Sequence, residues 1–266
     1  MINKKIIPVE KTKRTVFGIF GKFVADLFSM SFSLCFAGRP LIAVLKGIKL
    51  DQLYLNMMLI DAGPPHPVFF QKILQGDYWL FSRINQHWTC SFLDTVFLFM
   101  REAELWIPFY LFLLIFATLN FHKKGFIWCL YLAMTVIISD LISSNLIKNH
   151  LVFRLRPCHN PLWEDSMRFL ANYCPVGSSF TSSHACNHFA MAFFIYQTLR
   201  RTSSWWALVF PWAFFISYAQ VYVGVHYPLD VICGALVGSG IGILTSRVFR
   251  FQIGTLSLPT HNPSHA

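Results

Sequence analysis

The sequence has 266 residues, of which 55% are hydrophobic, 17% are aromatic and only 13% are charged. This composition, with a mean hydropathy of +0.50, argues against an ordinary soluble domain and is typical of an integral membrane protein. The formal net charge is +10, but the basic residues gather in short runs between apolar tracts and do not form one aromatic and basic surface. The charge therefore does not indicate a nucleic-acid partner, and we expect none.

The first 14 residues are polar and basic, and they precede an apolar run over residues 16–38 that Lys22 and Asp26 interrupt. Three interpretations of this run compete: a spanning helix, an amphipathic helix on the membrane surface and a signal peptide. The length of the run and its lack of an A-x-A-like ending count against a cleaved signal. We favour a membrane-embedded helix over one that lies flat.

The segment that follows, up to Arg83, carries no recognisable chemistry. A glycine and three prolines between residues 63 and 67 break any long helix there. We therefore predict that residues 1–75 form an N-terminal extension with a possible membrane helix and with amphipathic helices at the membrane surface.

The rest of the chain alternates between apolar tracts and short polar loops. A segment over residues 88–100 leads into a charged patch of Arg101, Glu102 and Glu104. A helix needs about 20 residues to cross a hydrocarbon core, so each later tract, with its flanks, is long enough to span. We predict an all-α fold, a polytopic membrane helical bundle of five or six transmembrane helices, with its core over residues 76–251 and a C-terminal tail over 252–266. The five tracts cover residues 105–121, 126–147, 186–199, 205–221 and 229–246.

The basic residues of the loops indicate how the chain is oriented in the membrane. Clusters at residues 122–124, 200–201 and 247–250 follow alternate tracts, so they lie on one side, which the positive-inside rule makes the cytoplasm. The loops over residues 148–184 and 221–228 then lie together on the opposite face. We expect this face to be the periplasmic side of a bacterial inner membrane.

The stretch over residues 218–230, YAQVYVGVHYPLD, holds a histidine, His226, and a carboxylate four residues later, Asp230. A histidine nucleophile needs its second ring nitrogen held by a carboxylate, which fixes the tautomer and makes the attacking nitrogen more basic. If a helix begins near Pro228, Asp230 lies within one turn of His226. On its own, the pair is explained as well by a solvated helix start.

Two further stretches give this pair a context, NHLVFRLRP over residues 149–157 and SSFTSSHACN over residues 178–187. Together the three stretches resemble the signature K-x6-R-P, P-S-G-H and S-R-x5-H-x3-D of the phosphatidic-acid phosphatase type 2 (PAP2) superfamily. These membrane lipid phosphatases share a fold with vanadium haloperoxidases. The resemblance runs from about residue 76 to residue 251. The matching residues are Arg156 and Pro157, Ser182 and His184, and His226 and Asp230.

The resemblance implies a phosphoryl transfer that needs no metal and no cofactor. It implies that His226 attacks phosphorus and becomes a phosphohistidine, that Asp230 orients it, and that His184 protonates the leaving oxygen and then activates water. Each residue singly also has an ordinary explanation as a helix cap or a surface histidine, but their order and shared membrane face favour a site. The groups expected to hold the phosphoryl oxygens are the Arg156 guanidinium, the Ser182 hydroxyl, and the amides of Ser183 and His184 at a helix start.

The sequence departs from the signature at two of the three expected phosphate-binding cations. Asn149 occupies the lysine position, with Lys148 one residue earlier, and Gln220 occupies the arginine position. A charge-assisted hydrogen bond contributes ~1.5–3 kcal/mol, so losing two weakens binding of the transition state unless other groups compensate. We expect Arg154 to point the same way as Arg156, and Lys148 to reach the site only if its helix is overwound or its side chain bends back. Asn149 and Gln220 remain as neutral donors. Thr181, Ser183 and Ala219 replace the proline, glycine and serine of the signature.

Cys158 and Cys174 fall in the loop between Arg156 and Ser182. A disulfide between them would close a short loop and contribute about 3 kcal/mol by the loop-entropy estimate, and two reduced thiols are the alternative. Without a matching second pair, the spacing does not indicate zinc, and we expect no metal. The other cysteines lie in or beside apolar tracts as small hydrophobes, namely Cys35, Cys90, Cys129, Cys186 and Cys233.

The sequence therefore predicts an integral membrane lipid phosphatase that acts on a polyprenyl diphosphate, a phosphatidate-type lipid or a lipid A phosphate. Its expected partners are the membrane and the lipid phosphate. The alternative is a catalytically weakened member that binds phospholipids or carries them across the membrane, for which Asn149 and Gln220 would mark the lost chemistry. No inverted hydropathy repeat supports an unrelated transporter.

Overall fold

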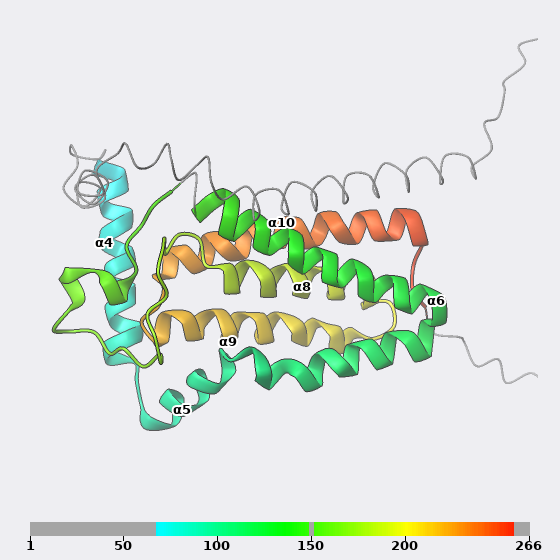
Figure 1. Ribbon diagram of the computed structural model, residues 1–266, viewed down its shortest axis with the longest axis horizontal. Coiled ribbons are helices and arrows are strands. Elements are labelled where there is room, and N and C mark those ends of the chain that lie inside the picture. Colours follow the sequence, from blue (N-terminus) through cyan, green and yellow to red (C-terminus); the bar gives the residue numbers. More distant parts are fainter. Residues whose placement is uncertain (1–67, 149–151, 258–266) are drawn as a thin grey trace, which may run out of the picture. The chain divides into compact units, whose positions relative to one another are not determined.

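The computed structural model describes residues 68–148 and 152–257, and every regular element in these two ranges is a helix (Figure 1). The predicted all-α fold class is confirmed for this part of the chain. The apolar run over residues 16–38, most of the N-terminal extension, Asn149 and the end of the C-terminal tail lie outside the described residues.

The helices follow the apolar tracts of the sequence, and α6 carries two of those tracts. The α-helices are α4 (Val68–Ser82), α5 (Ser91–Met100), α6 (Ile107–Asp140), α8 (Ser183–Leu199), α9 (Val209–Tyr222) and α10 (Pro228–Ile253). Two π-helices are η1 (Arg83–His87) and η3 (Leu141–Ile147). The short 3-10 helices are η2 (Ala103–Trp106), η4 (Pro157–His159), η5 (Pro161–Trp163) and η6 (Ser204–Leu208).

Helix α6 consists of two antiparallel arms. His122 has a φ of 50° and a ψ of −123°, outside the helical region, and a Cβ added to Gly125 would lie 1.8 Å from the carbonyl oxygen of Ala117. In a straight helix, positions eight residues apart are separated by about 12 Å along the axis, so the chain must turn back at His122. The first arm runs away from α5, and the second arm returns toward the end of the bundle at which the first began (Figure 1). The turn coincides with the basic loop predicted over residues 122–124.

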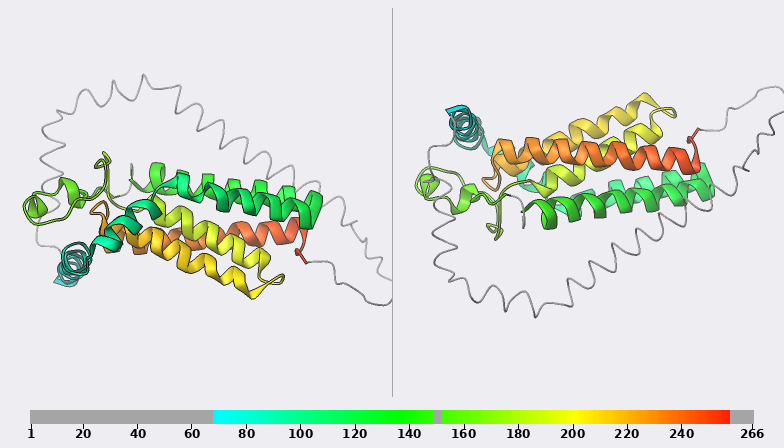
Figure 2. Two further views of the ribbon diagram at one scale, coloured as in Figure 1. Left: turned by 90° about the horizontal axis from the view of Figure 1, so that it is seen from below. Right: turned by 90° about the horizontal axis from the view of Figure 1, so that it is seen from above.

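The two arms of α6 lie side by side with α8, α9 and α10 (Figures 1 and 2). Helix α10 packs mainly against α8 and α6, and α9 packs against α8 and α5. Helix α4 crosses one end of this bundle. It is upright in Figure 1, and it is seen end-on in Figure 2. The bundle is therefore closed at one end by a helix that runs across the others.

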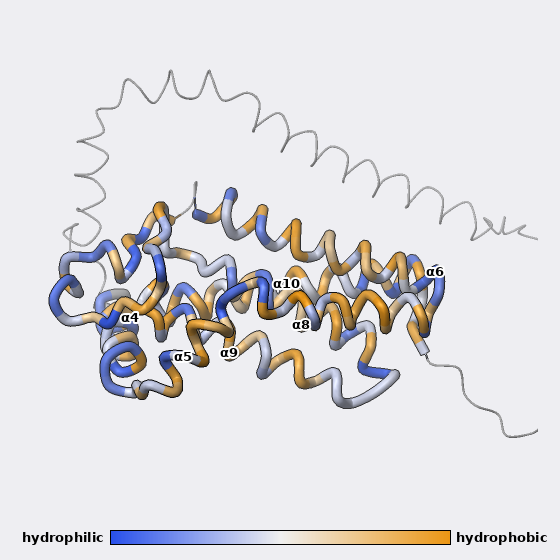
Figure 3. The backbone as a smooth tube through the Cα atoms, turned by 60° about the horizontal axis from the view of Figure 1, so that its bottom comes forward, coloured by the Kyte–Doolittle hydropathy of each residue, from blue (hydrophilic) through white to orange (hydrophobic). Residues whose placement is uncertain are grey.

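Hydrophobic residues recur along the helices of the bundle (Figure 3). Large side chains such as Leu119, Phe214, Leu236 and Leu244 are exposed on different helices, as expected of a surface that faces lipid. Within residues 68–148 and 152–257, two stretches are long and apolar enough to cross a membrane, Ala103–Ile147 and Pro228–Ile253, and the first contains both arms of α6. The predicted number of five or six spans stays a prediction.

The predicted start of the core at residue 76 falls inside α4, which is one continuous helix. Helix α4 also packs on the bundle, because the Phe81 ring lies 5.3 Å from that of Tyr227 and Asp77 forms an ion pair with Arg154. Helix α4 thus packs on the bundle on both sides of the predicted boundary, and at the other end α10 continues to Ile253. The predicted domain bounds stay a prediction.

A row of glycines on α10 allows α8 to approach closely. A Cβ added to Gly238 would lie 2.0 Å from the carbonyl oxygen of Cys186, and one added to Gly234 or Gly242 would lie 2.5 or 2.3 Å from backbone oxygens of α8. Small residues four positions apart share one face of a helix and let helices in a membrane pack backbone to backbone. This contact sets the spacing between the beginnings of α8 and α10, where the polar residues gather.

Replacing Gly238 with alanine should push α8 and α10 apart and lower the free energy of unfolding by about 1–3 kcal/mol, because the added methyl group overlaps a carbonyl oxygen. The matched control is Gly240→Ala, where an added Cβ meets nothing within 4 Å. This control should leave stability unchanged or raise it by up to ~1 kcal/mol, because alanine is the better helix former. Unfolding of the detergent-solubilised protein, followed by circular dichroism, gives both values. Equal stability of the two variants would contradict the close α8–α10 contact.

Candidate active site

The three polar stretches meet at one end of the bundle. Lys148 directly follows η3, Ser182 caps α8, and His226 and Asp230 lie just before and within the first turn of α10. The Ser182 N–H donates to the backbone carbonyl of Asp230 at 3.0 Å, which joins the beginnings of α8 and α10. Segments far apart in the sequence therefore form one polar site, as the loop topology predicts.

The loop from α9 to α10 folds back so that His226 lies against the end of α9. The carbonyl oxygen of Gln220 accepts the N–H groups of Val225 at 3.0 Å and of His226 at 3.1 Å. Gly224 permits this turn, because its φ of 87° favours glycine and an added Cβ would lie 2.5 Å from Met167. His226 is only 2% exposed, so its backbone and its environment are both fixed by the fold.

The two ring nitrogens of His226 have different partners. Nε2 lies 3.1 Å from Nη1 of Arg156, and because a guanidinium only donates, Nε2 is the acceptor. Nδ1 lies 3.3 Å from the Ser179 hydroxyl and 3.6 Å from Oδ2 of Asp230. Burial, with the charge of Arg156, lowers the pKa of His226 to about 4. At neutral pH the ring is therefore uncharged, with its proton on Nδ1 and a lone pair on Nε2.

Ser179 bridges the histidine and the carboxylate. At 3.6 Å, the distance between Nδ1 of His226 and Oδ2 of Asp230 is longer than a normal hydrogen bond. The Ser179 hydroxyl donates to that Oδ2 at 2.5 Å and lies within reach of Nδ1. The Tyr227 N–H also donates to Oδ2, at 2.9 Å. Asp230 thus orients the ring largely through Ser179.

Arg154 was expected to supply a phosphate-binding cation, but its guanidinium is engaged by two carboxylates. Nη1 donates to Asp230 at 2.8 Å and Nη2 donates to Asp77 at 2.5 Å, while the group lies 3.9 Å over the Tyr227 ring. Although burial opposes its charge, the two carboxylates raise the pKa of Arg154. Arg154 thus lies at the site and holds Asp230, while its predicted role in phosphate binding stays a prediction.

Arg156 lies on the other side of the imidazole and is held only weakly. Besides His226, it reaches the carbonyl oxygens of Val225 at 3.3 Å and Ser178 at 3.4 Å, and its buried Nε has no hydrogen-bond partner among the described residues. These long contacts leave donors available for an oxyanion. Burial is the main cause that lowers the pKa of Arg156, although the group stays charged.

Lys148 reaches the site although it stands one residue before the lysine position of the signature. Its Nζ donates to the Ser183 hydroxyl at 2.8 Å, and the Ser144 hydroxyl lies 2.9 Å from the same oxygen. The helix before it is not overwound, as one explanation required, but widens into the π-helix η3. Burial, and secondarily the charge of Arg156, lowers the pKa of Lys148 to about 8.

Ser182 and His184 occupy the beginning of α8. Ser182 is fully buried, and its hydroxyl caps the helix by accepting the Ala185 N–H at 3.4 Å. The exposed His184 ring stacks on His188 with the centroids 6.4 Å apart. Desolvation by the surrounding protein, and then the charges of His188 and His226, lower the pKa of His184 to about 3. Both imidazoles therefore lie at the same end of the bundle.

Comparison with known proteins shows the family to which this chain is related. The sequence model of the PAP2 superfamily matches residues 124–253. An undecaprenyl-diphosphatase of Sulfolobus acidocaldarius is 33% identical over 178 residues, which cover 64% of this chain and 76% of the relative. The chain belongs to the PAP2 superfamily. The resemblance inferred from the three motifs is thereby confirmed.

Other PAP2 relatives are named for a different activity. A lipid A 4′-phosphatase of Bacteroides thetaiotaomicron is 33% identical over 139 residues, which are 50% of this chain and 60% of that protein. A lipid A 4′-phosphatase of Porphyromonas gingivalis is 28% identical over 202 residues, which cover 74% of this chain and 72% of the relative. The match thus spans less than two thirds of the Bacteroides protein.

The two positions that lack the PAP2 cations behave differently from the motif residues. Gln220 is fully buried in α9, and neither its amide nitrogen nor its amide oxygen has a hydrogen-bond partner among the described residues. Its backbone carbonyl, in contrast, holds the His226 loop. Asn149 lies outside the described residues. The Gln220 amide, one of the two predicted neutral donors, thus has no hydrogen bond to another described residue.

Two members of the network were not predicted from the sequence, Ser179 and Asp77. Ser179 belongs to the stretch SSFTSSHACN, where neighbouring serines give no signal that distinguishes it. Asp77 stands in α4, outside the matched motifs, and accepts the Leu229 N–H at 2.7 Å as well as the Arg154 ion pair. Its only sequence signal is a lone carboxylate in an otherwise mostly apolar helix.

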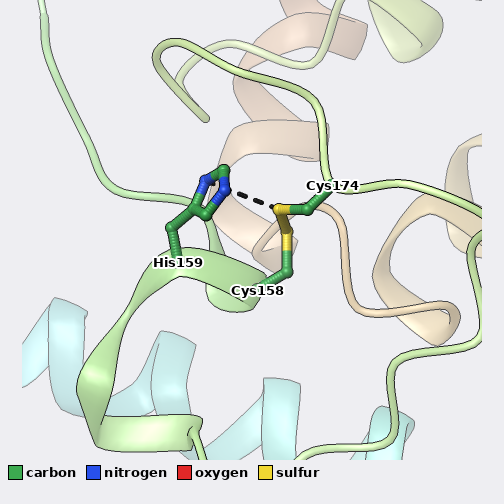
Figure 4. Close-up of side chains that lie close together, drawn as sticks. All are labelled: Cys158, His159 and Cys174. Carbon is green, nitrogen blue, oxygen red and sulfur yellow. Dashed lines mark hydrogen bonds between the residues drawn. A yellow bond between two sulfur atoms is a disulfide. The ribbon is translucent and has the colours of Figure 1, made fainter.

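A disulfide joins Cys158 and Cys174 beside the site, with their Cα atoms 6.1 Å apart. His159 lies next to it, with Nδ1 3.4 Å from the sulfur of Cys174 (Figure 4). The three potential ligand atoms lie within 4.8 Å of one another, but the two bonded sulfur atoms are not thiolates and so do not form a metal site. The bridge ties the segment after Arg156 to the segment that leads to Ser179.

Proposed function

We propose that this chain is an integral membrane lipid phosphatase that works through a phosphohistidine on His226. The observation that carries the proposal is the state of the His226 ring. Its Nε2 has a lone pair and faces only the Arg156 guanidinium, 3.1 Å away, while its Nδ1 side is held by Ser179 and Asp230. A neutral imidazole with one nitrogen oriented and the other available is the form that a nucleophile requires.

In the first step, Nε2 of His226 attacks phosphorus and the bond between phosphorus and the lipid oxygen breaks. Asp230 stabilises the positive charge that develops on the ring, through Ser179. His184 gives a proton to the leaving alkoxide from its imidazolium form. Desolvation and nearby positive charges lower the pKa of His184 to about 3 in the free site, and the anionic phosphoryl group of a bound substrate raises it again. In the second step, His184 removes a proton from water, the water oxygen attacks phosphorus, and the bond between phosphorus and nitrogen breaks to release phosphate.

The transferred group is held by the cationic side of the same site. Arg156 leaves its long contacts and turns two donors toward the phosphoryl oxygens. Lys148 and the Ser183 hydroxyl, which lie 2.8 Å apart, bind on the side of α8. The free N–H groups at the beginning of α8 add the positive end of the helix dipole. These groups supply the electrostatic stabilisation without a metal ion in this proposal.

A lipid is the favoured substrate class, for two reasons. The relatives described above are named as phosphatases of lipid A or of undecaprenyl diphosphate. In addition, an apolar groove lies along α6 and α9, lined by residues that include Trp106, Phe112 and Trp212. Trp212 packs on His188 with the centroids 5.0 Å apart, and His188 adjoins His184. A lipid tail in this groove would leave its headgroup near the histidines, and lipid A phosphates and polyprenyl diphosphates are the first candidates.

We further propose that the site faces the periplasm from a bacterial inner membrane, with five or six helices crossing the bilayer. The end of the bundle opposite the site carries the basic clusters of residues 122–124, 200–201 and 247–250. An excess of basic residues in short loops is typical of the cytoplasmic side.

The rival function is lipid binding or translocation without chemistry. The observation that favours it is Gln220, an uncharged residue at a cation position of the signature. Such a protein would retain phosphate affinity, but the histidine pair would be dispensable for its function. Hydrolysis of a lipid phosphate therefore distinguishes a lipid phosphatase from a lipid-binding or lipid-translocating protein.

Replacing His226 with alanine should lower phosphate release from a lipid panel by at least about a thousand-fold, because the attacking atom is removed. The panel contains lipid A, undecaprenyl diphosphate and phosphatidate, presented in detergent micelles. The control is His87→Ala, an exposed histidine in η1, which should retain wild-type turnover. Wild-type turnover in His226→Ala would remove the mechanism, and no turnover by the wild type on any lipid would favour the rival.

The pH dependence of kcat/KM should have two limbs. Activity should fall below about pH 4, where His226 gains a proton and loses its lone pair, and above about pH 8, where Lys148 loses its charge. Lys148→Arg should remove the alkaline limb, because a guanidinium stays charged well beyond that pH. The measurement compares initial rates of the two proteins from pH 3 to pH 10. An alkaline limb that is identical in both would exclude Lys148 as its source.

A further inference from the structure

Arg101 is a charged residue near the site that belongs to none of the three motifs. It caps the C-terminal end of α5, and its Nε is buried without a hydrogen-bond partner among the described residues. It forms no ion pair within the part of the chain that the structure describes. The neighbouring Arg168, in contrast, pairs with Asp94 at 2.5 Å. Arg101 is thus a half-buried cation with Glu102 as its adjacent acidic residue and with no ion pair among the described residues.

The packing of aromatic side chains places Arg101 beside the start of α8. Before it, the Phe97 ring lies 4.8 Å from that of Tyr222 at the end of α9. After it, Trp106 packs on Trp212 at 5.6 Å, and Trp212 packs in turn on His188. The segment that carries Arg101 is therefore fixed along α9 on both sides, close to the turn of α8 that holds His184.

Electrostatic interactions connect Arg101 with the site itself. After burial, the charge of Arg101 contributes to lowering the pKa of Arg156 and that of His184. Burial also lowers the pKa of Arg101 itself, while Glu102 and then Tyr173 act in the opposite direction. Arg101, Arg156 and Lys148 thus bring like charges together at one end of the bundle. Like charges in a partly buried place repel one another, and an oxyanion relieves this repulsion.

The charge of Glu102 favours that of Arg101 without forming an ion pair among the described residues. The other acidic residues near this end of the bundle have hydrogen bonds or ion pairs with other groups. The two unpaired buried donors nearby, Nε of Arg156 and the amide nitrogen of Gln220, also lack an acceptor among the described residues. The acids and their partners are Asp77 and Asp230 with Arg154, Asp94 with Arg168, and Asp140 with Ser144 and Asn187.

We propose that Arg101 is a phosphate-binding residue that supplies, from the end of α5, the cation that Gln220 does not provide. It binds the phosphoryl oxygens on the His184 side, while Arg156 binds them on the His226 side and Lys148 binds them at the start of α8. The assignment rests on the proposed phosphatase site and deepens it, because it accounts for one of the two missing motif cations.

The test is binding of orthovanadate, an inorganic phosphate analogue, to the purified full-length protein in detergent by isothermal titration calorimetry. Arg101→Gln should raise the dissociation constant by about ten- to a hundred-fold, the effect of one charge-assisted hydrogen bond. Arg101→Lys should weaken binding less, because it keeps the charge and loses the forked geometry. The matched control is Arg201→Gln, an exposed arginine at the other end of the bundle, which should bind as the wild type does.

An unchanged unfolding temperature shows that each variant is folded. If Arg101→Gln does not fold, the test uses Arg101→Lys, for which we expect a loss of vanadate affinity of at least about three-fold. Binding within two-fold of wild type in the folded Arg101 variants would overturn the proposal, as would an equal loss in Arg201→Gln. If His226→Ala still hydrolysed lipid while Arg101→Gln weakened vanadate binding, the phosphohistidine mechanism would be contradicted. The role of Arg101 in phosphate binding would still be supported.

Discussion

The buried carboxylate of Asp230 is the group on which the site depends. Arg154 donates to one of its oxygens, and Ser179 and the Tyr227 N–H donate to the other. An unpaired buried charge destabilises a fold by several kcal/mol, so these three segments must assemble around Asp230 together. The same contacts orient the ring of His226, and the backbone carbonyl of Asp230 holds the beginning of α8 through Ser182. The arrangement of the proposed catalytic groups is therefore a consequence of how one charge is buried.

The arrangement also separates two kinds of cation. Arg154 is neutralised by two carboxylates and serves the fold, whereas Arg156 has long contacts and Lys148 has only hydroxyl partners. Arg101, with no ion pair among the described residues, joins the second group. A site that keeps unneutralised cations around a neutral histidine is suited to an oxyanion, and it does so although two motif positions carry amides. In the proposed site, cations at other positions than those of the signature would supply the electrostatic effect.

Sequence patterns predicted the parts of the structure that depend on local order. The apolar tracts marked the helices, the basic residues 122–124 marked the turn of α6, and loop alternation predicted that the motifs meet. No comparable sequence pattern indicated the contacts between segments that are distant in the sequence. The pairing of Arg154 with Asp77, the bridge through Ser179 and the position of Arg101 depend on tertiary packing, as does the contact of α4 with the bundle.

The most direct test of a covalent intermediate on His226 requires no knowledge of the lipid. Inorganic phosphate labelled with oxygen-18 is incubated with the protein, and loss of the label to water is followed by mass spectrometry. A phosphohistidine formed reversibly from phosphate should cause the wild type to exchange the label, while His226→Ala should not. Equal exchange by both proteins, or no exchange by a wild type that hydrolyses lipid, would contradict the account.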